Sequence, residues 1–181
     1  MQDAFEDVAQ GGAGVPTDQY RRAHQIGVLV GKAPRSIAII FTGHSLGGGL
    51  AAEAAMVAGR PAVTFNAAGV NQFNIPQHSE RATIDAYSTY GDPLTFLQNS
   101  RRIIIAGIGS TPFMPAKGLS ATMQLLGSLP QAIGHQVVIP DYAGQHDSVW
   151  DNFNPLYDFE RHKIGRLIQN IHIYEVILKC K

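Results

Sequence analysis

The chain has little charge, a single cysteine and no metal-ligand pattern, and each of these shortages excludes a class of protein. Charged residues make up 15% of the 181 residues and the formal net charge is zero, so no basic face predicts nucleic-acid binding. Cys180 is the only cysteine, which excludes a disulfide within the chain. The seven histidines show no H-E-x-x-H spacing, so we expect neither a metal nor an organic cofactor.

The chain also lacks two kinds of targeting segment. Residues 1–7 are acidic, whereas a secretory signal needs a cationic start and an apolar run. The apolar stretch 103–108 is too short to span a bilayer and is interrupted by Gly107, Gly109 and Pro112. The compartment is left open, and we expect a chain that is cytoplasmic or is exported by a route that the sequence does not show.

Short apolar runs alternate with helical patterns along the chain. We expect strands at 36–42, 62–66, 82–88 and 136–140, and helices at 18–31, 46–58 and 158–178. Such alternation is typical of a parallel sheet with both faces covered. The sequence thus predicts one α/β domain over residues 1–181, with a mainly parallel sheet and helices on both faces. For 94–133 we favour a helix pair packed on the sheet over a mobile apolar flap above the site.

The most informative stretch is Gly43-His44-Ser45-Leu46-Gly47, which joins an apolar strand to an alanine-rich helix. This pattern places a serine on a strained strand-to-helix turn, where flanking glycines lack the Cβ that would clash. Ser45 would project from the carboxyl end of a strand, beside helix N–H groups that favour an oxyanion. The alternative is a glycine-rich turn that only redirects the chain or binds a phosphate.

A serine hydroxyl needs a base, usually a histidine, that is oriented in turn by a carboxylate. We favour His162, because it stands in the first turns of the terminal helix after a loop that can reach the sheet. His135 and His146 are the alternatives, and His44 is expected to pack within the turn and to point away from Ser45. The other histidines are expected to be structural or solvated: His24, His78 and His172.

Asp92 is the favoured carboxylate, because a turn places it just beyond the carboxyl end of the strand at 82–88. There it would accept a hydrogen bond from the imidazole and fix its tautomer. Asp85 is a weaker choice inside a strand, and Asp141 or Asp147 would require a different fold.

The chain order Ser45, Asp92, His162 is the order found in α/β-hydrolases. Simpler roles remain for two of these residues. Asp92 could be an ordinary turn residue before a proline, and His162 a solvated residue on an amphipathic helix.

Two runs of residues carry a resemblance to a known family. Gly43 to Ala51 reads GHSLGGGLA, and Pro61 to Gly69 reads PAVTFNAAG. Together they resemble the bacterial branch of the class 3 lipases, which are α/β-hydrolases that cleave acylglycerols or phospholipids. The similarity begins near Gln19 and extends to His162, so it covers most of the chain.

The resemblance implies a role for each candidate residue. In that family a Gly-Asp-Pro turn like Gly91-Asp92-Pro93 carries the acid of the triad, and a late histidine like His162 carries the base. The backbone N–H of Leu46 would donate to the oxyanion formed when Ser45 attacks an ester. The implied substrate is a lipid or another ester, reached at a membrane surface, while the residues that bind it stay unassigned.

The sequence departs from the family ahead of the strand at 36–42. Family members have further strands there and an Arg-Gly-Thr or Arg-Gly-Ser loop that supplies a second oxyanion donor. Here only 35 residues precede Ser36, and they read as loop and helix. Three explanations fit a truncated α/β-hydrolase fold: a fragment of a longer lipase, a strand edge at 36–42 that pairs with a partner or a second copy of the chain, or missing parts rebuilt from residues 1–34. We favour a truncated hydrolase or one completed by a partner.

Three functions fit these observations. The favoured one is a serine carboxylester hydrolase of the lipase or phospholipase type, acting through an acyl-enzyme. An acyltransferase or thioesterase would use the same three residues with a different acceptor or ester. A non-catalytic binding or assembly module with a hydrolase fold is the alternative from another class.

Overall fold

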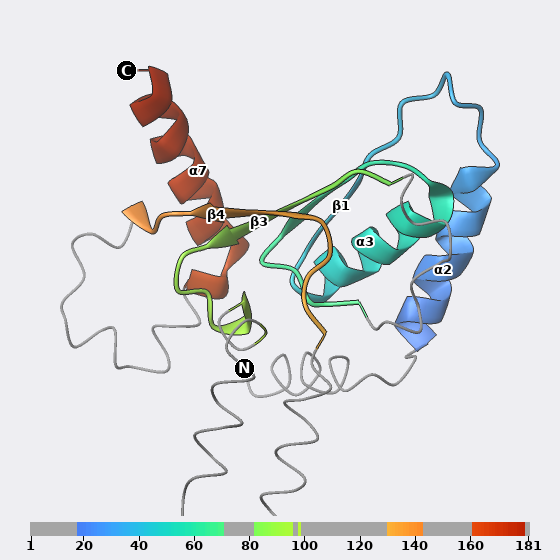
Figure 1. The fold of residues 1–181 in the computed structure, drawn as a ribbon, viewed down its shortest axis with the longest axis horizontal. Helices are drawn as coiled ribbons and strands as arrows, with labels where there is room; N and C mark the ends of the chain where they lie inside the picture. Colours follow the sequence, from blue (N-terminus) through green and yellow to red (C-terminus); the bar gives the residue numbers. More distant parts are fainter. Residues whose placement is uncertain (1–17, 71–81, 96–97, 99–129, 143–160, 180–181) are drawn as a thin grey trace, which may run out of the picture.

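The computed structural model describes residues 18–70, 82–95, 98, 130–142 and 161–179. Their helices and strands, in chain order, are α2 (Asp18–Gly31), β1 (Phe41–His44), α3 (Leu46–Ala58), β2 (Ala62–Phe65), β3 (Ile84–Thr89), β4 (His135–Ile139) and α7 (Ile164–Lys179). Figure 1 shows the strands together in one sheet with helices around it. The predicted α/β fold is confirmed.

The sheet is parallel throughout, with the strand order β1-β2-β3-β4. Gly43 of β1 lies beside Thr64 of β2, which lies beside Ala86 of β3. Parallel strands all end on the same side of a sheet, where α/β proteins place their sites. The residues that follow β1, β2 and β3 are therefore brought to one rim.

Small residues let α3 pack closely on both the sheet and α2. Alanine has the highest helix propensity, and Ala55 in the middle of α3 is fully buried. A Cβ on Gly49 would stand 2.5 Å from the hydroxyl of Tyr20, a residue of α2 that donates to the carbonyl of Gly69. The buried side chains of this core come from α2, α3, β2, β3 and the segment that follows β2: Tyr20, Ala52, Ala55, Met56, Ala62, Val70 and Ile84.

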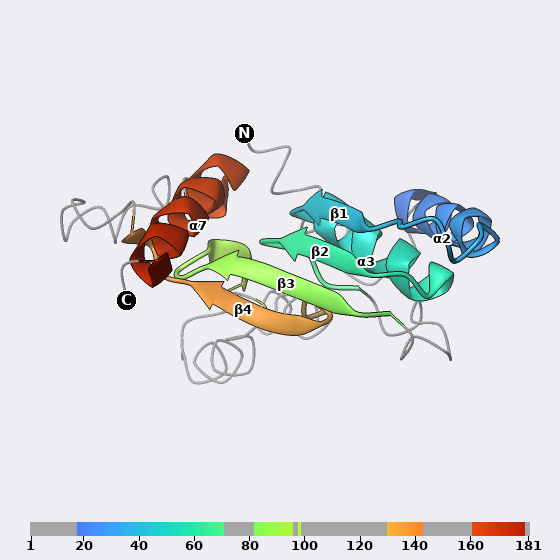
Figure 2. The same ribbon diagram turned by 90° about the horizontal axis from the view of Figure 1, so that it is seen from above.

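The last helix, α7, lies toward the carboxyl ends of the strands, away from α2 and α3 (Figure 2). Its apolar residues Ile164, Ile168 and Ile171 line a groove that His44 and Phe65 border from the sheet. None of the described helices is long and apolar enough to cross a membrane.

The first strand differs from its predicted extent. It begins at Phe41 and continues through His44, whereas the sequence predicts a strand from 36 to 42. Residues 37–40 precede it as irregular chain, and Ile40 is 62% exposed. A strand needs a hydrogen-bonding neighbour, and among the described residues β1 has only β2 beside it. Phe41 pairs with Ala62, the first residue of β2, so the residues before Phe41 have no partner in β2.

Two other predictions concern segments that the structure describes only in part. Lys163 alone separates His162 from the first residue of α7, so His162 stands just ahead of that helix and not inside its first turns. The helix pair or flap predicted for 94–133 lies mostly outside the described residues, as does the start predicted for the last helix at 158.

Two apolar grooves border β1. Ile26 of α2, Phe41 and Leu50 line the first groove, and Phe65 and Ile168 line the second; Thr42 borders both. In the described part of the chain no strand covers the outer edge of β1. The partner or second copy predicted to pair with it therefore stays a prediction.

A charged substitution beside the open edge of β1 tests whether two copies of the chain pair through it. We expect wild-type protein to associate as its concentration rises, and Ile40→Lys to shift it toward monomer, because a lysine blocks edge pairing. Sedimentation velocity over a range of concentrations measures this. Val138→Lys is the matched control, since Val138 is 54% exposed on β4, at the other end of the sheet. An equal effect of both substitutions would contradict pairing through β1.

A buried carboxylate lies between α2 and α3. Glu53 of α3 is 2% exposed, and its Oε2 has no hydrogen-bond partner. Its Oε1 is 3.6 Å from Nδ1 of His24, which is half-exposed. Burial disfavours the charged form and raises the pKa of Glu53 to about 7.

This raised pKa predicts that stability falls as the pH rises. Between the usual pKa of a glutamate and about 7, the folded protein holds a proton that the unfolded chain has lost, so the free energy of unfolding declines through this window. Glu53→Gln should flatten that decline and stabilise the protein more at pH 8 than at pH 5. Urea denaturation at both pH values measures it, with Glu175→Gln on an exposed carboxylate as control. Equal slopes for Glu53→Gln and wild type would contradict the assignment.

Candidate active site

Ser45 occupies a strained turn between β1 and α3. Its φ of 55° and ψ of −126° place a non-glycine residue in a region that L-residues rarely adopt. A Cβ on Gly43 would collide with the carbonyl of Gly47, so the first glycine of the pattern is required, as predicted. The second is not: a Cβ on Gly47 would meet nothing within 4 Å, whereas one on Gly48 would stand 2.7 Å from the Cβ of Ala67.

The three residues predicted to act together are hydrogen-bonded in series. Oγ of Ser45 is 2.8 Å from Nε2 of His162, and Nδ1 of His162 is 2.6 Å from Oδ1 of Asp92. An ionised carboxylate only accepts hydrogen bonds, so Nδ1 carries the proton and Nε2 accepts from the serine hydroxyl. The structure therefore brings together Ser45, Asp92 and His162, residues far apart in the sequence.

Asp92 is a fully buried carboxylate whose two oxygens are both engaged. Its side chain is 0% exposed; Oδ1 binds His162, and Oδ2 accepts from the backbone N–H of Thr95 at 2.7 Å. The backbone N–H of Asp92 donates to the carbonyl of Thr89, the last residue of β3, and so closes the turn. Burying a charge is costly unless it is hydrogen-bonded, and these contacts meet that requirement.

Two further side chains hold the backbone of His162, and sequence reasoning missed both roles. Nε2 of His44 donates to the carbonyl of His162 at 2.6 Å, and Nδ2 of Asn66 donates to the same oxygen at 3.1 Å. His44 was predicted to pack within the turn, but its ring reaches beyond the turn to the backbone of His162. Burial lowers the pKa of His44, so its neutral form is favoured. Asn66 directly follows β2. This position at the rim was the only feature of the sequence that pointed to a role for Asn66 in the site.

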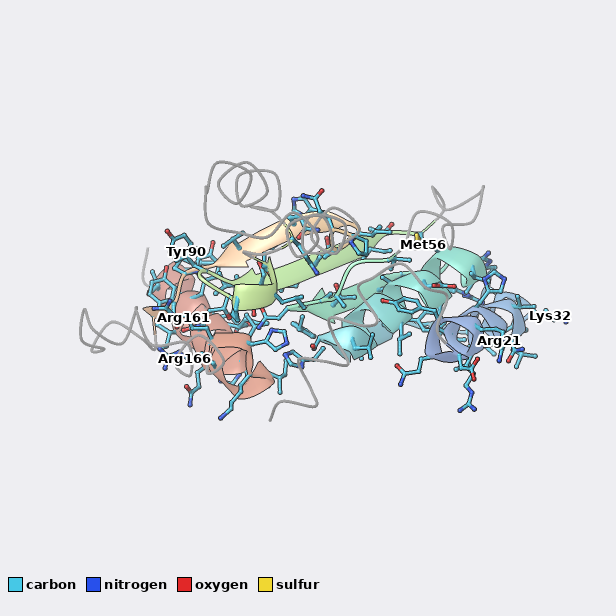
Figure 3. All side chains as sticks on the ribbon, turned by 90° about the horizontal axis from the view of Figure 1, so that it is seen from below. Arg21, Lys32, Met56, Tyr90, Arg161 and Arg166 are labelled. Carbon is cyan, nitrogen blue, oxygen red and sulfur yellow. The ribbon has the colours of Figure 1, made fainter. Side chains whose placement is uncertain are left out.

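A partly buried ion cluster holds the start of α7. Asp141, just after β4, accepts from Nε of Arg161 at 3.2 Å, Nε of Arg166 at 2.8 Å and Nδ2 of Asn170 at 3.0 Å. Burial alone would raise the pKa of Asp141, but these hydrogen bonds and the two guanidinium charges outweigh it and lower the pKa. Figure 3 shows Arg161 and Arg166 side by side near α7. Asp141 thus serves this cluster and does not contact Ser45 or His162.

The other candidates lie elsewhere or outside the described residues. His135 and Asp85 pair with each other at 3.4 Å, both well exposed, near the amino-terminal ends of β4 and β3 and away from the rim. His24 faces Glu53, and His172 lines the groove beside α7. His78, His146 and Asp147 lie outside the described residues. Within the described part of the chain, no three histidine, cysteine or acidic side chains converge as metal ligands would.

The predicted oxyanion donor begins a helix. Leu46 is the first residue of α3, where backbone N–H groups have no carbonyl four residues earlier in the helix. The carbonyl of Ser45 is occupied, since it accepts from the N–H groups of Gly48, Gly49 and Ala68. Among the backbone hydrogen bonds of the described residues, the N–H of Leu46 has no acceptor.

The fold and this rim define an α/β protein with a strained serine hydrogen-bonded to histidine and, through it, to a buried aspartate. Comparison with known proteins then gives the family. Residues 1–145 match the family model of the Tle-like phospholipase domain, described as phospholipase-like, and the chain belongs to that family. The predicted resemblance to lipase- and phospholipase-like hydrolases is confirmed.

One curated relative adds a second similarity. The chain is 42% identical over 88 residues to the extracellular phospholipase A1 of Serratia liquefaciens. The matched region covers 43% of this chain and 28% of the relative, so the similarity spans less than a third of that protein. The predicted truncation of the fold stays a prediction.

The two glycines that flank the turn provide a matched test of its geometry. Gly43→Ala should lower the free energy of unfolding by about 1–3 kcal/mol, because its Cβ collides with the backbone at Gly47. Gly47→Ala should be neutral or stabilising by up to about 1 kcal/mol, because there is space for a Cβ in the first turn of a helix. Chemical denaturation measures both. Equal effects on stability would contradict this turn geometry.

Proposed function

We propose that the chain carries the catalytic site of a serine carboxylester hydrolase of the lipase or phospholipase type. The observation that carries the proposal is the hydrogen-bonded series from Ser45 through His162 to buried Asp92. A hydroxyl so placed can lose its proton to a base as it attacks, and the base is oriented by a carboxylate. Membership in a phospholipase-like family supports the same reaction class.

The proposed reaction begins with acyl transfer to the serine. Oγ of Ser45 attacks the ester carbonyl while its proton passes to Nε2 of His162, and Asp92 stabilises the imidazolium that forms. The N–H of Leu46 donates to the oxyanion of the tetrahedral intermediate. His162 then returns the proton to the departing alcohol, which leaves an ester between the acyl group and Ser45.

Water completes the cycle: it now attacks the acyl group, and Ser45 is the group that leaves. His162 removes a proton from water as it attacks the acyl-enzyme, and returns that proton to Oγ of Ser45 when the fatty acid leaves. An acyltransferase would differ only in using another alcohol in place of water, and a thioesterase in beginning from a thioester. These two activities share the proposed site and are distinguished only by the substrate.

A lipid ester is the proposed substrate class. Two apolar grooves border the turn that carries the serine, one reaching Gly47 and Leu50 and the other Gly43 and His44. Apolar surface of this kind suits an acyl chain. The curated relative is named as a phospholipase A1, and by analogy we propose a phospholipid at a membrane surface. The acyl-chain length and head group stay open.

Labelling of Ser45 tests the proposal directly. We expect a fluorophosphonate probe to label wild-type protein at Ser45, and hydrolysis of p-nitrophenyl esters and phospholipid vesicles to fall on the order of 10⁴-fold or more in Ser45→Ala. Mass spectrometry locates the label, and circular dichroism verifies that both proteins are folded.

The outcomes separate the candidate functions. Folded wild-type protein that neither labels nor hydrolyses would favour a non-catalytic module and would overturn the enzyme proposal. Activity that persists unchanged in Ser45→Ala would show that Ser45 is not the nucleophile. Labelling with acyl transfer to an added alcohol in preference to water would favour an acyltransferase.

A further inference from the structure

The carbonyl oxygen of His162 accepts hydrogen bonds from two side chains on neighbouring strands. His44 ends β1 and reaches it with Nε2 at 2.6 Å; Asn66 follows β2 and reaches it with Nδ2 at 3.1 Å. A carbonyl oxygen has two lone pairs, so both acceptor positions are used. The backbone of the residue proposed as the base is therefore fixed to the sheet on two sides.

Asn66 is itself held rigidly. Its side chain is 0% exposed, its φ is 41°, and its backbone N–H donates to the carbonyl of Tyr87 in β3. Oδ1 accepts from the backbone N–H of Thr89 at 2.9 Å, which places Nδ2 toward the carbonyls of His162 and Arg161. One amide thus connects the end of β3, which leads into the turn with the buried aspartate, to the segment that carries the imidazole.

His44 connects the nucleophile's turn to the same point. It directly precedes Ser45, and its ring centre lies 5.0 Å from that of His162. A carbonyl cannot donate, so Nε2 of His44 must carry a proton, and in the neutral ring Nδ1 then carries none. The favoured neutral form therefore places its single N–H on the backbone of His162.

A backbone held in this way fixes where the imidazole stands. The ring has to keep one nitrogen 2.6 Å from Asp92 and the other 2.8 Å from Ser45. A misplacement of about 1 Å can cost on the order of 10²-fold in rate. Arg161, bound to Asp141, holds the preceding residue from the side of β4.

We propose that His44 and Asn66 are positioning residues that align the imidazole of His162 between Asp92 and Ser45 by holding its backbone carbonyl. The inference rests on the proposed hydrolase function. A merely structural role for the two side chains would predict that their loss lowers stability and leaves the alignment of the ring unchanged. The test therefore needs a readout of the ring itself.

Three variants separate the hydrogen bond from the shape of each side chain. Asn66→Asp keeps the size, the tolerance of a positive φ and the acceptor for Thr89, but replaces the donor with a carboxylate oxygen. His44→Phe keeps a ring without a donor, and His44→Gln restores a donor of similar reach. Ile84→Val, a core truncation near the amino-terminal end of β3, is the control for a general loss of stability.

We expect Asn66→Asp and His44→Phe to lower kcat on the order of 10²-fold with KM within about twofold of wild type, because each removes a hydrogen bond that holds the base and neither removes a group that binds substrate. His44→Gln should recover most of the loss, and Ile84→Val should keep wild-type kcat. Proton NMR gives the second readout, since a histidine N–H held by a carboxylate resonates far downfield. That resonance, assigned with His162→Ala, should be lost in Asn66→Asp and His44→Phe and kept in Ile84→Val.

The two readouts keep this proposal distinct from the proposed function. If wild type neither hydrolyses nor labels at Ser45, the function fails, while the resonance still tests the alignment of His162. Retention of the resonance and of kcat in Asn66→Asp and His44→Phe would overturn the positioning role. If Asn66→Asp does not fold, the comparison of His44→Phe with His44→Gln decides, and equal values for those two would also overturn it.

Discussion

The parallel pairing of β1, β2 and β3 is the constraint on which the site depends. Its register puts His44 beside Phe65 and Phe65 beside Tyr87, so the residues just beyond these strands share one rim. Each strand then contributes one polar group there: a serine after β1, an amide after β2 and a carboxylate in the turn after β3. A one-residue slip in any pairing would turn these side chains to the opposite face and separate them.

The remaining group comes from a distant part of the chain, and buried polar contacts hold it there. His162 is bound through its ring to Asp92, through its carbonyl to Asn66, and through its neighbour Arg161 to Asp141. Asp92, which is buried, and Asp141, which is partly buried, both have their carboxylate oxygens satisfied by hydrogen bonds. Glu53 is the contrast: it has an unpaired oxygen, and its raised pKa shows what burial does without such partners.

Local patterns in the sequence were enough for the residues whose positions are set by local geometry. The glycine-flanked Ser45 and the strand-end position of Asp92 follow from turn chemistry, and chain order points to His162. The direction of His44 did not follow, because it depends on the strained φ and ψ of the turn beside it. Asn66 did not follow either, because its contacts lie with Thr89 and with a segment 96 residues away. The start of β1 was predicted too early, because the strand extends only as far as β2 lies beside it.

The two halves of the proposed chemistry depend on different parts of the fold. Activation of Ser45 requires the rim and the segment before α7, which the described residues contain. For the proposed stabilisation of the oxyanion, the described residues offer the N–H of Leu46, and the loss of one donor in a serine hydrolase costs roughly 10²–10³ in rate. A strand added in parallel along the open edge of β1 would end beside His44, at the same rim, by the rule that assembles the rest of the site. In the proposed mechanism, the last backbone N–H groups of such a strand would lie next to the serine, where a second oxyanion donor is needed, so the proposed pairing at β1 and the proposed oxyanion site would depend on the same edge.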